Sequence, residues 1–164
     1  MERNVVLTSL QDLSPVMETC IAEGSEVVLT ITGNSMRTYL RHRRDQVVLK
    51  KAEKNMLRIG DVPLYRRENG QFVLHRVVDL GASCYTMCGD GQCEKEYGVS
   101  AKSVVAVATG FYRRGKLVQC TDLQYRAYVH LWMWLFPLRR MLLKGGSFVW
   151  RCGRKIRGIF KKKV

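Results

Sequence analysis

The sequence predicts a mainly β domain, preceded by a short helix and followed by a basic segment. Three observations predict this fold class. Short β-branched and aliphatic runs recur through the middle of the chain, Gly- and Asp-containing turn sequences separate them, and helical apolar spacing is confined to the two ends. Many short strands joined by turns indicate a coiled β-sheet or a partly open barrel. We therefore expect a helix in residues 1–24, a β domain in 25–120 and a helical tail in 121–164.

The amino-terminal helix is predicted from apolar residues that recur every three or four positions. They are Leu10, Leu13, Met17, Cys20 and Ile21. Thr8 or Ser9 would cap this helix, and Gly24 would end it. Pro15 lies near enough to the helix start to be tolerated.

The strands follow in order after this helix. They are predicted at 27–31, at 46–50, from the Gly60-Asp61 turn to Tyr65, at 72–78, at 84–88, once or twice within 99–112, and at 117–119. Pro63 has no amide hydrogen, so it indicates an edge or the entry of a strand. Residues 68–71 (Glu-Asn-Gly-Gln) predict a hairpin turn and 89–91 (Gly-Asp-Gly) a second tight turn.

The positive charge belongs to the carboxyl-terminal segment. Residues 111–164 contain 14 Lys and Arg against Asp122 alone, whereas residues 1–110 contain 14 against 13 acidic residues. Such a segment favours an anionic partner, lipid or nucleic acid, and its aromatic residues favour lipid. No stretch reaches the roughly 20 apolar residues of a spanning helix. The tail therefore predicts amphipathic helices that lie in the membrane interface.

The six cysteines are expected to be reduced thiols. No secretory signal precedes them, which favours a cytoplasmic protein without disulfides. Cys84, Cys88 and Cys93 lack the tight Cys-x-x-Cys pair of a zinc site, so we expect no metal and no cofactor. Cys88 is a weaker candidate nucleophile than a serine, because no second histidine is expected near it.

Three residues of the predicted β domain have catalytic potential. Ser35 follows a strand and Gly33, and a glycine there permits a sharp turn that exposes the next side chains. His75 is expected within a strand, and Asp90 within the 89–91 turn. Taken singly, each has an ordinary structural explanation: a turn serine, a packed histidine and a turn aspartate.

Together and in this order, the motifs resemble the signal peptidase I family, serine peptidases that share a fold with self-cleaving repressors. The matching segments are Gly33-Asn34-Ser35-Met36, 57–62 (Leu-Arg-Ile-Gly-Asp-Val), 74–78 (Leu-His-Arg-Val-Val) and 89–91, so the resemblance covers roughly residues 25–112. His75-Arg76 matches the branch with a histidine base. The resemblance implies that Ser35 is the nucleophile and its amide an oxyanion donor, that His75 is the base supported by Asp90, and that Met36 contacts substrate.

Physical chemistry agrees with these roles. A serine hydroxyl is a weak nucleophile until a base takes its proton, which contributes about 10²–10⁴-fold to the rate. Histidine is mostly neutral at cytosolic pH and is suited to this task. We thus expect a serine endopeptidase that cleaves peptide or leader segments. Because no amino-terminal anchor is recognised, we expect it on the inner face of the membrane, held there by its tail.

Other functions remain open at this stage. The chain departs from the family pattern, with Gly33 where a hydroxyl residue is common, Thr38 where proline is usual and Gln92 after the Gly-Asp-Gly turn. These departures favour the alternative of an inactive peptidase fold that binds a peptide, a partner or a membrane. A repressor-like regulator is disfavoured, since too few residues precede Ser35 for a helix-turn-helix domain.

Overall fold

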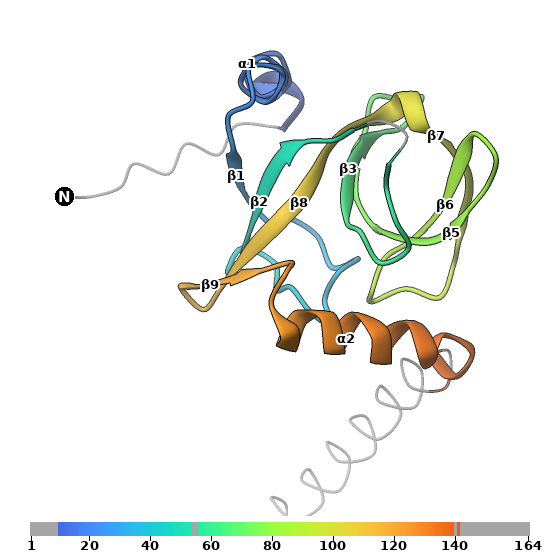
Figure 1. Ribbon diagram of the computed structural model, residues 1–164. Helices are drawn as coiled ribbons and strands as arrows, with labels where there is room; N and C mark the ends of the chain where they lie inside the picture. Colours follow the sequence, from blue (N-terminus) through green and yellow to red (C-terminus); the bar gives the residue numbers. More distant parts are fainter. Residues whose placement is uncertain (1–9, 54–55, 140, 142–164) are drawn as a thin grey trace, which may run out of the picture.

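The computed structural model describes residues 10–53, 56–139 and 141, and this part of the chain is mainly β (Figure 1). In these described residues, one α-helix precedes the strands, α1 (Leu10–Ala22), and another follows them, α2 (Leu123–Trp134), with short 3₁₀ turns at Ala101–Ser103 and Phe136–Leu138. The strands are β1 (Val27–Thr30), β2 (Gln46–Lys51), β3 (Pro63–Arg66), β4 (Phe72–Leu74), β5 (Arg76–Leu80), β6 (Cys84–Cys88), β7 (Glu96–Ser100), β8 (Val104–Arg113) and β9 (Lys116–Gln119).

The larger sheet is curled into half a barrel. Its strand order is β1-β2-β8-β3-β4, with β9 paired to β8, and every pairing is antiparallel. Register shifts interrupt the β2–β8 ladder between Val48 and Leu49 and the β3–β8 ladder between Leu64 and Tyr65. Such irregularities increase local twist, which explains why the sheet curls. Strands β1 and β4 lie at the two ends of this order, and β9 is a further edge beside β8.

The second sheet contains β5, β6 and β7 in that order. It receives the chain directly from the first sheet, because β4 ends at Leu74 and β5 begins at Arg76. The single strand predicted for residues 72–78 is therefore wrong: the apolar run is continuous, but the chain changes sheets at His75. Pro63 occupies the first position of β3, which confirms strand entry and not an edge, because β3 lies between β8 and β4.

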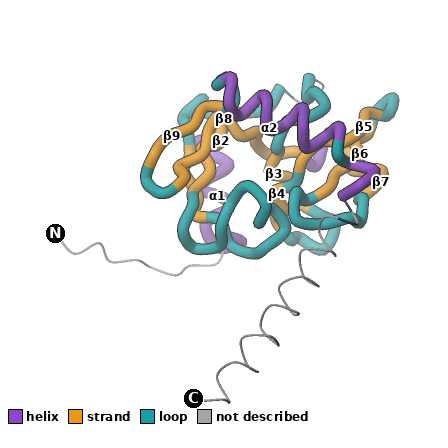
Figure 2. The backbone as a smooth tube through the Cα atoms, turned by 90° about the horizontal axis from the view of Figure 1, so that it is seen from below, coloured by secondary structure: helices purple, strands orange, loops and turns teal. Residues whose placement is uncertain are grey.

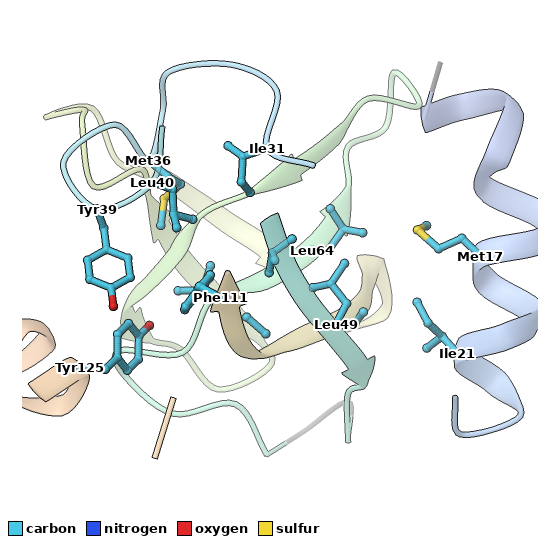
Figure 3. Packing of buried hydrophobic residues seen from close by; sticks show 14 residues of the cluster. Met17, Ile21, Ile31, Met36, Tyr39, Leu40, Leu49, Leu64, Phe111 and Tyr125 are labelled. Carbon is cyan, nitrogen blue, oxygen red and sulfur yellow. The ribbon is translucent and has the colours of Figure 1, made fainter. Parts of the chain in front are cut away.

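The main core lies between α1, the larger sheet and α2. Met17 and Ile21 point from α1 towards Leu49 of β2, while Tyr125 of α2 meets Tyr39 at the opposite side (Figure 3). Helix α2 crosses one end of the molecule from the β8–β9 side to the second sheet, as the view from below makes clear (Figure 2).

The helical tail predicted for residues 121–164 is described only in part by the structure. Helix α2 confirms a helix from Leu123, but residue 140 and residues 142–164 of the predicted interfacial tail lie outside the described residues. Within the described ranges, no helix has the length and apolarity needed to cross a bilayer.

Candidate active site

Ser35 lies half-buried in the loop between β1 and β2, called the serine loop below. This loop has a backbone conformation that requires glycine at position 33. Gly33 has φ of +98°, and its N–H donates to Nδ1 of His42 over 2.8 Å. This contact anchors the loop two residues before the serine. The amide of Ser35 donates to no acceptor in the described part of the chain, so it is free to bind a ligand oxygen.

The backbone of the Gly89-Asp90-Gly91 turn packs against the backbone of the serine loop. The Gly91 N–H donates to the Ser35 carbonyl oxygen over 2.6 Å. A Cβ atom on Gly89 would lie 2.6 Å from that same oxygen, and one on Gly91 would lie 2.9 Å from the Asn34 oxygen. Two glycines are needed here because the loop packs directly on their backbone.

His75 lies at the crossing between the two sheets, with a relative exposure of 5%. Burial lowers the pKa of its imidazole to about 4, since burial penalises the charged ring. The ring is therefore neutral at physiological pH and has a lone pair available for a proton.

Ser35 and His75 line one open cavity of about 340 Å³. Apolar side chains from β1 to β4 and from the loop between β1 and β2 make up part of the remaining wall: Leu29, Ile31, Met36, Val47, Leu64, Phe72 and Leu74. No hydrogen bond joins Ser35 to His75 among those of the described residues. Catalytic hydrogen bonds often tighten only when substrate is bound, so this geometry is compatible with a dyad.

A phenol and a carboxylate, neither predicted from the sequence, orient His75. The Tyr65 hydroxyl donates to Oε2 of Glu96 over 2.8 Å and lies 3.2 Å from His75 Nδ1. Arg67 binds both Glu96 oxygens, and its hydrogen bonds lower the pKa of this carboxyl.

This network decides the tautomer of His75. Glu96 is ionised and only accepts, so it takes the single Tyr65 proton. The Tyr65 oxygen must then accept from Nδ1–H of His75, which leaves the lone pair on Nε2. Tyr65 is on β3 and Glu96 on β7, so no local motif connects them, and only the pairing of the strands would have revealed the network.

Asp90 does not make the contact with His75 that the resemblance implied. Its carboxylate binds the Arg76 guanidinium through two hydrogen bonds of 2.8 and 2.6 Å, and both side chains are fully buried. Tyr128 of α2 donates to Oδ2 over 3.0 Å. Asp90 thus fastens the 89–91 turn to the residue next to His75 in sequence.

Arg76 connects further elements to the same point. The Nη1 atom of Arg76 donates one hydrogen bond to the Gly60 carbonyl oxygen over 2.6 Å and another to the Tyr125 hydroxyl oxygen over 3.0 Å. A Cβ atom on Gly60 would lie 2.9 Å from Val129 of α2. The 57–62, 74–78 and 89–91 motifs therefore meet around one buried guanidinium, and the 33–36 motif is bound to the 89–91 turn.

Met36 has a mixed position. It lines the cavity, as expected of a substrate contact, but its side chain is 2% exposed and its Sδ accepts from the Asp90 N–H over 3.4 Å. It therefore also ties the serine loop to the 89–91 turn.

No family model, curated protein or solved structure matches this chain.

Other chemistries find little support in the described residues. Their Cys20, Cys84, Cys88, Cys93 and Cys120 have free thiols, and no group of three side chains there is arranged to hold a metal ion. Burial raises the pKa of the Cys88 thiol, which disfavours the thiolate that a nucleophile needs. Ser35 remains the better candidate nucleophile, because it lines the same cavity as the neutral His75 ring and its own amide has no partner among the described residues.

Proposed function

We propose that this protein is a serine endopeptidase of the signal peptidase type, with Ser35 as nucleophile and His75 as general base. One observation carries the proposal: Ser35 and a neutral, oriented His75 open on the same cavity. The dyad needs no metal or cofactor, because the base, the nucleophile and an oxyanion donor all belong to the chain.

The reaction proceeds through an acyl-enzyme. His75 Nε2 takes the Ser35 hydroxyl proton as Oγ bonds to the scissile carbonyl carbon, and the oxygen that becomes negative accepts from the Ser35 N–H. His75 then gives the proton to the leaving amine as the C–N bond breaks. Water then bonds to the ester carbonyl carbon as His75 takes one of its protons, and the C–Oγ bond breaks to release the acid while His75 returns that proton to Ser35 Oγ. One backbone donor of this kind contributes roughly 3–4 kcal/mol.

An extended peptide is the substrate that suits this cavity. The cavity is bordered by residues of β1 and β4, two edge strands of the curled sheet, whose unpaired backbone groups are able to accept a further strand. The apolar part of its wall, which includes Leu29 and Phe72, favours an apolar side chain in the substrate. Asp90 acts in this proposal through Arg76, as a positioning residue.

Cleavage of a proteome-derived peptide mixture, read as new amino termini by mass spectrometry, tests the proposal. Ser35→Ala and His75→Ala should each reduce cleavage to about a hundredth of wild type or less. Ser25→Ala, at an exposed serine outside the cavity, is the matched control and should cleave normally. Cleavage that survives both dyad substitutions contradicts the assignment.

A non-catalytic peptide-binding module is the second candidate. It is favoured by the missing hydrogen bond between Ser35 and His75 among the described residues, and by Gly33, which offers no hydroxyl donor. A serine-directed acylating probe separates the two functions: the peptidase is labelled at Ser35, and labelling disappears in His75→Ala, whereas the binding module is not labelled.

A further inference from the structure

The serine loop also lines a basic hollow at the protein surface. Met36, Tyr39 and Leu40 point from this loop into the core (Figure 3). Arg37 and Arg41, each next to one of these buried residues in sequence, are exposed. Five residues line an open hollow of about 540 Å³, called the basic hollow below: Asn34, Arg37, Thr38, Arg41 and His42.

The basic hollow adjoins the cavity of Ser35 and His75, called the catalytic cavity below. Asn34, the residue before Ser35, lines both. A Cβ atom on Gly91 would lie 2.7 Å from Cγ of Arg37, so the aliphatic part of this arginine packs on the 89–91 turn. An extended peptide advances about 3.3 Å per residue. A peptide bound beside Ser35 therefore reaches the basic hollow within a few residues.

The charge of the basic hollow has one sign. None of its five lining residues is acidic. Asp45, the acidic residue nearest to them in sequence, is fully buried and binds Arg44 through two hydrogen bonds of 2.7 and 2.8 Å. The side chains of Arg37 and Arg41 form no ion pair with any residue that the structure describes. Two guanidinium groups are consequently available to an anion.

His42 adds a neutral hydrogen-bond donor to the basic hollow. Its Nδ1 accepts from the Gly33 N–H over 2.8 Å, so the proton of the neutral ring is on Nε2. The backbone is fixed nearby as well, because the Arg41 N–H donates to Oδ2 of buried Asp45 over 2.9 Å. The donors of the basic hollow thus belong to a loop that is folded before any ligand binds, which lowers the ordering cost of binding.

We propose that the basic hollow binds the carboxylate of an aspartate or glutamate in the peptide substrate, a few residues from the bond that is cut. The inference rests on the proposed peptidase function and deepens it by naming the substrate class: a peptide with an apolar side chain in the catalytic cavity and an acidic side chain beside it. Arginine suits this task because its planar guanidinium donates two parallel hydrogen bonds to one carboxylate. A nucleic acid is less suited, since its phosphates require a longer basic surface than the two arginines of the hollow.

Peptide binding to the full-length Ser35→Ala chain tests this subsite without cleavage. The probes are fluorescent decapeptides of leucine and alanine with two aspartates, placed at the amino end in one peptide and at the carboxyl end in another, and the same peptides with asparagine instead. Fluorescence anisotropy at low salt should show that one aspartate peptide binds about threefold to tenfold more tightly than its asparagine counterpart, as two exposed ion pairs contribute. Added salt should reduce this preference.

Charge substitutions in the basic hollow provide the comparison. Arg37→Gln combined with Arg41→Gln should abolish the preference, and Arg37→Glu combined with Arg41→Glu should make a lysine-substituted peptide the tighter ligand. Lys102→Glu combined with Lys116→Glu is the matched control, with the same change in net charge. Both lysines are exposed and line neither cavity, so this variant should keep the preference for aspartate. Circular dichroism confirms that each variant is folded.

Three results overturn the acidic subsite. The first is equal or undetectable binding of the aspartate and asparagine peptides in both arrangements, and the second is a preference that survives the arginine substitutions. The third is an oligodeoxythymidine of equal charge that binds more tightly than both aspartate peptides and loses this binding in the arginine variants, which would assign the basic hollow to nucleic acid.

Failure of the subsite and failure of the peptidase function give different results. Cleavage of the proteome-derived peptide mixture by the wild-type chain is read separately from binding. Cleavage through Ser35 without an aspartate preference contradicts the subsite alone. An aspartate preference without cleavage contradicts the peptidase and leaves the acidic subsite to a peptide-binding module.

Discussion

Tyr65 gives His75 the form that a general base requires. A buried neutral histidine has two tautomers, and only one of them leaves Nε2 free. Ionised Glu96 takes the Tyr65 proton, so the phenol oxygen accepts from Nδ1–H. In the familiar serine triad a carboxylate contacts the histidine directly. Here a phenol lies between them, and Glu96 Oε2 is 3.9 Å from His75 Nδ1.

Removing this phenol should therefore affect catalysis more than binding. We expect Tyr65→Phe to lower kcat by about tenfold to a hundredfold, part of the about 10²–10⁴-fold that a general base contributes, with little change in KM. Steady-state kinetics on a peptide found by the cleavage screen measures both constants. Tyr97→Phe removes an exposed hydroxyl from β7 and should leave both unchanged. An unaltered kcat in Tyr65→Phe would show that the tautomer needs no phenol.

Residue identities were predictable only where a local motif marks them. Ser35 follows its glycine, and His75 and Asp90 lie in short motifs whose order is informative. Tyr65 and Glu96 are 31 positions apart and meet only because β3, β4 and the second sheet converge at His75. Burial likewise sets the pKa of His75, and burial is a property of the folded chain.

At the scale of elements, the 89–91 turn acts as a seat for the serine loop. Because its glycines have no side chains, the backbone of this turn contacts the backbone of the serine loop directly. The Ser35 carbonyl oxygen lies where a side chain on Gly89 would otherwise be. Asp90 also fixes the turn in place through its hydrogen bonds with Arg76 and Tyr128. The position of Ser35 is consequently determined by an element more than fifty residues further along the chain.

A single methyl group added to this turn at Gly89 should displace the serine loop. Gly89 does not have a positive φ, so Gly89→Ala acts through its contact with the Ser35 oxygen and not through backbone strain. We expect a loss of about 1–3 kcal/mol in the free energy of unfolding, as for overpacking, and about a hundredfold lower kcat/KM, the effect of displacing a reacting group by about 1 Å.

Gly115→Ala is the control for this substitution. Gly115 has φ of +80°, with open space where a Cβ would be, and lies in the turn between β8 and β9, so alanine there strains the backbone away from the cavity. It should lower the melting temperature and leave kcat/KM unchanged. Equal activity in the two variants would mean that the turn does not position Ser35.

Most elements were predictable because their periodicity and turns are local. Helix α1, strands β1, β2, β6 and β9 and the Gly-Asp turns lie close to the predicted positions. The single strand predicted for 72–78 was wrong because an apolar run does not reveal a change of sheet. Strand β7 was missed at its start, where Glu96, Tyr97 and Gly98 lack a strand pattern.

At the scale of the whole molecule, the described residues form two sheets with a common apolar cluster, to which Tyr65 and Val104 of the larger sheet and Val77 and Met87 of the second sheet belong. Helix α2 crosses one end of both sheets (Figure 2). The mainly β class and the curled half-barrel sheet follow from many short strands and antiparallel turns, and they were predictable. The meeting of the motifs around Arg76 was not. A fully buried guanidinium is stable there because a carboxylate, a carbonyl oxygen and a phenol satisfy it.

His75 makes this architecture sensitive to acid. Its pKa is about 4 when folded and about 6.5 when unfolded, so between these values the unfolded chain binds more protons. The stability that depends on neutral His75 is therefore present above pH 6.5, is lost as the pH falls towards 4, and does not decrease further below that. The loss corresponds to about 3 kcal/mol at most. Urea unfolding at a series of pH values measures it.

His75→Asn provides the comparison, because asparagine does not titrate and is still able to contact the Tyr65 hydroxyl. The carboxyl groups of the chain are common to both proteins, and Asp45, whose pKa the Arg44 hydrogen bond lowers to about 2, loses its contribution only at lower pH. The wild-type free energy of unfolding should thus fall more steeply than that of His75→Asn between pH 6.5 and 4. Parallel curves would show that His75 is not buried as a neutral ring.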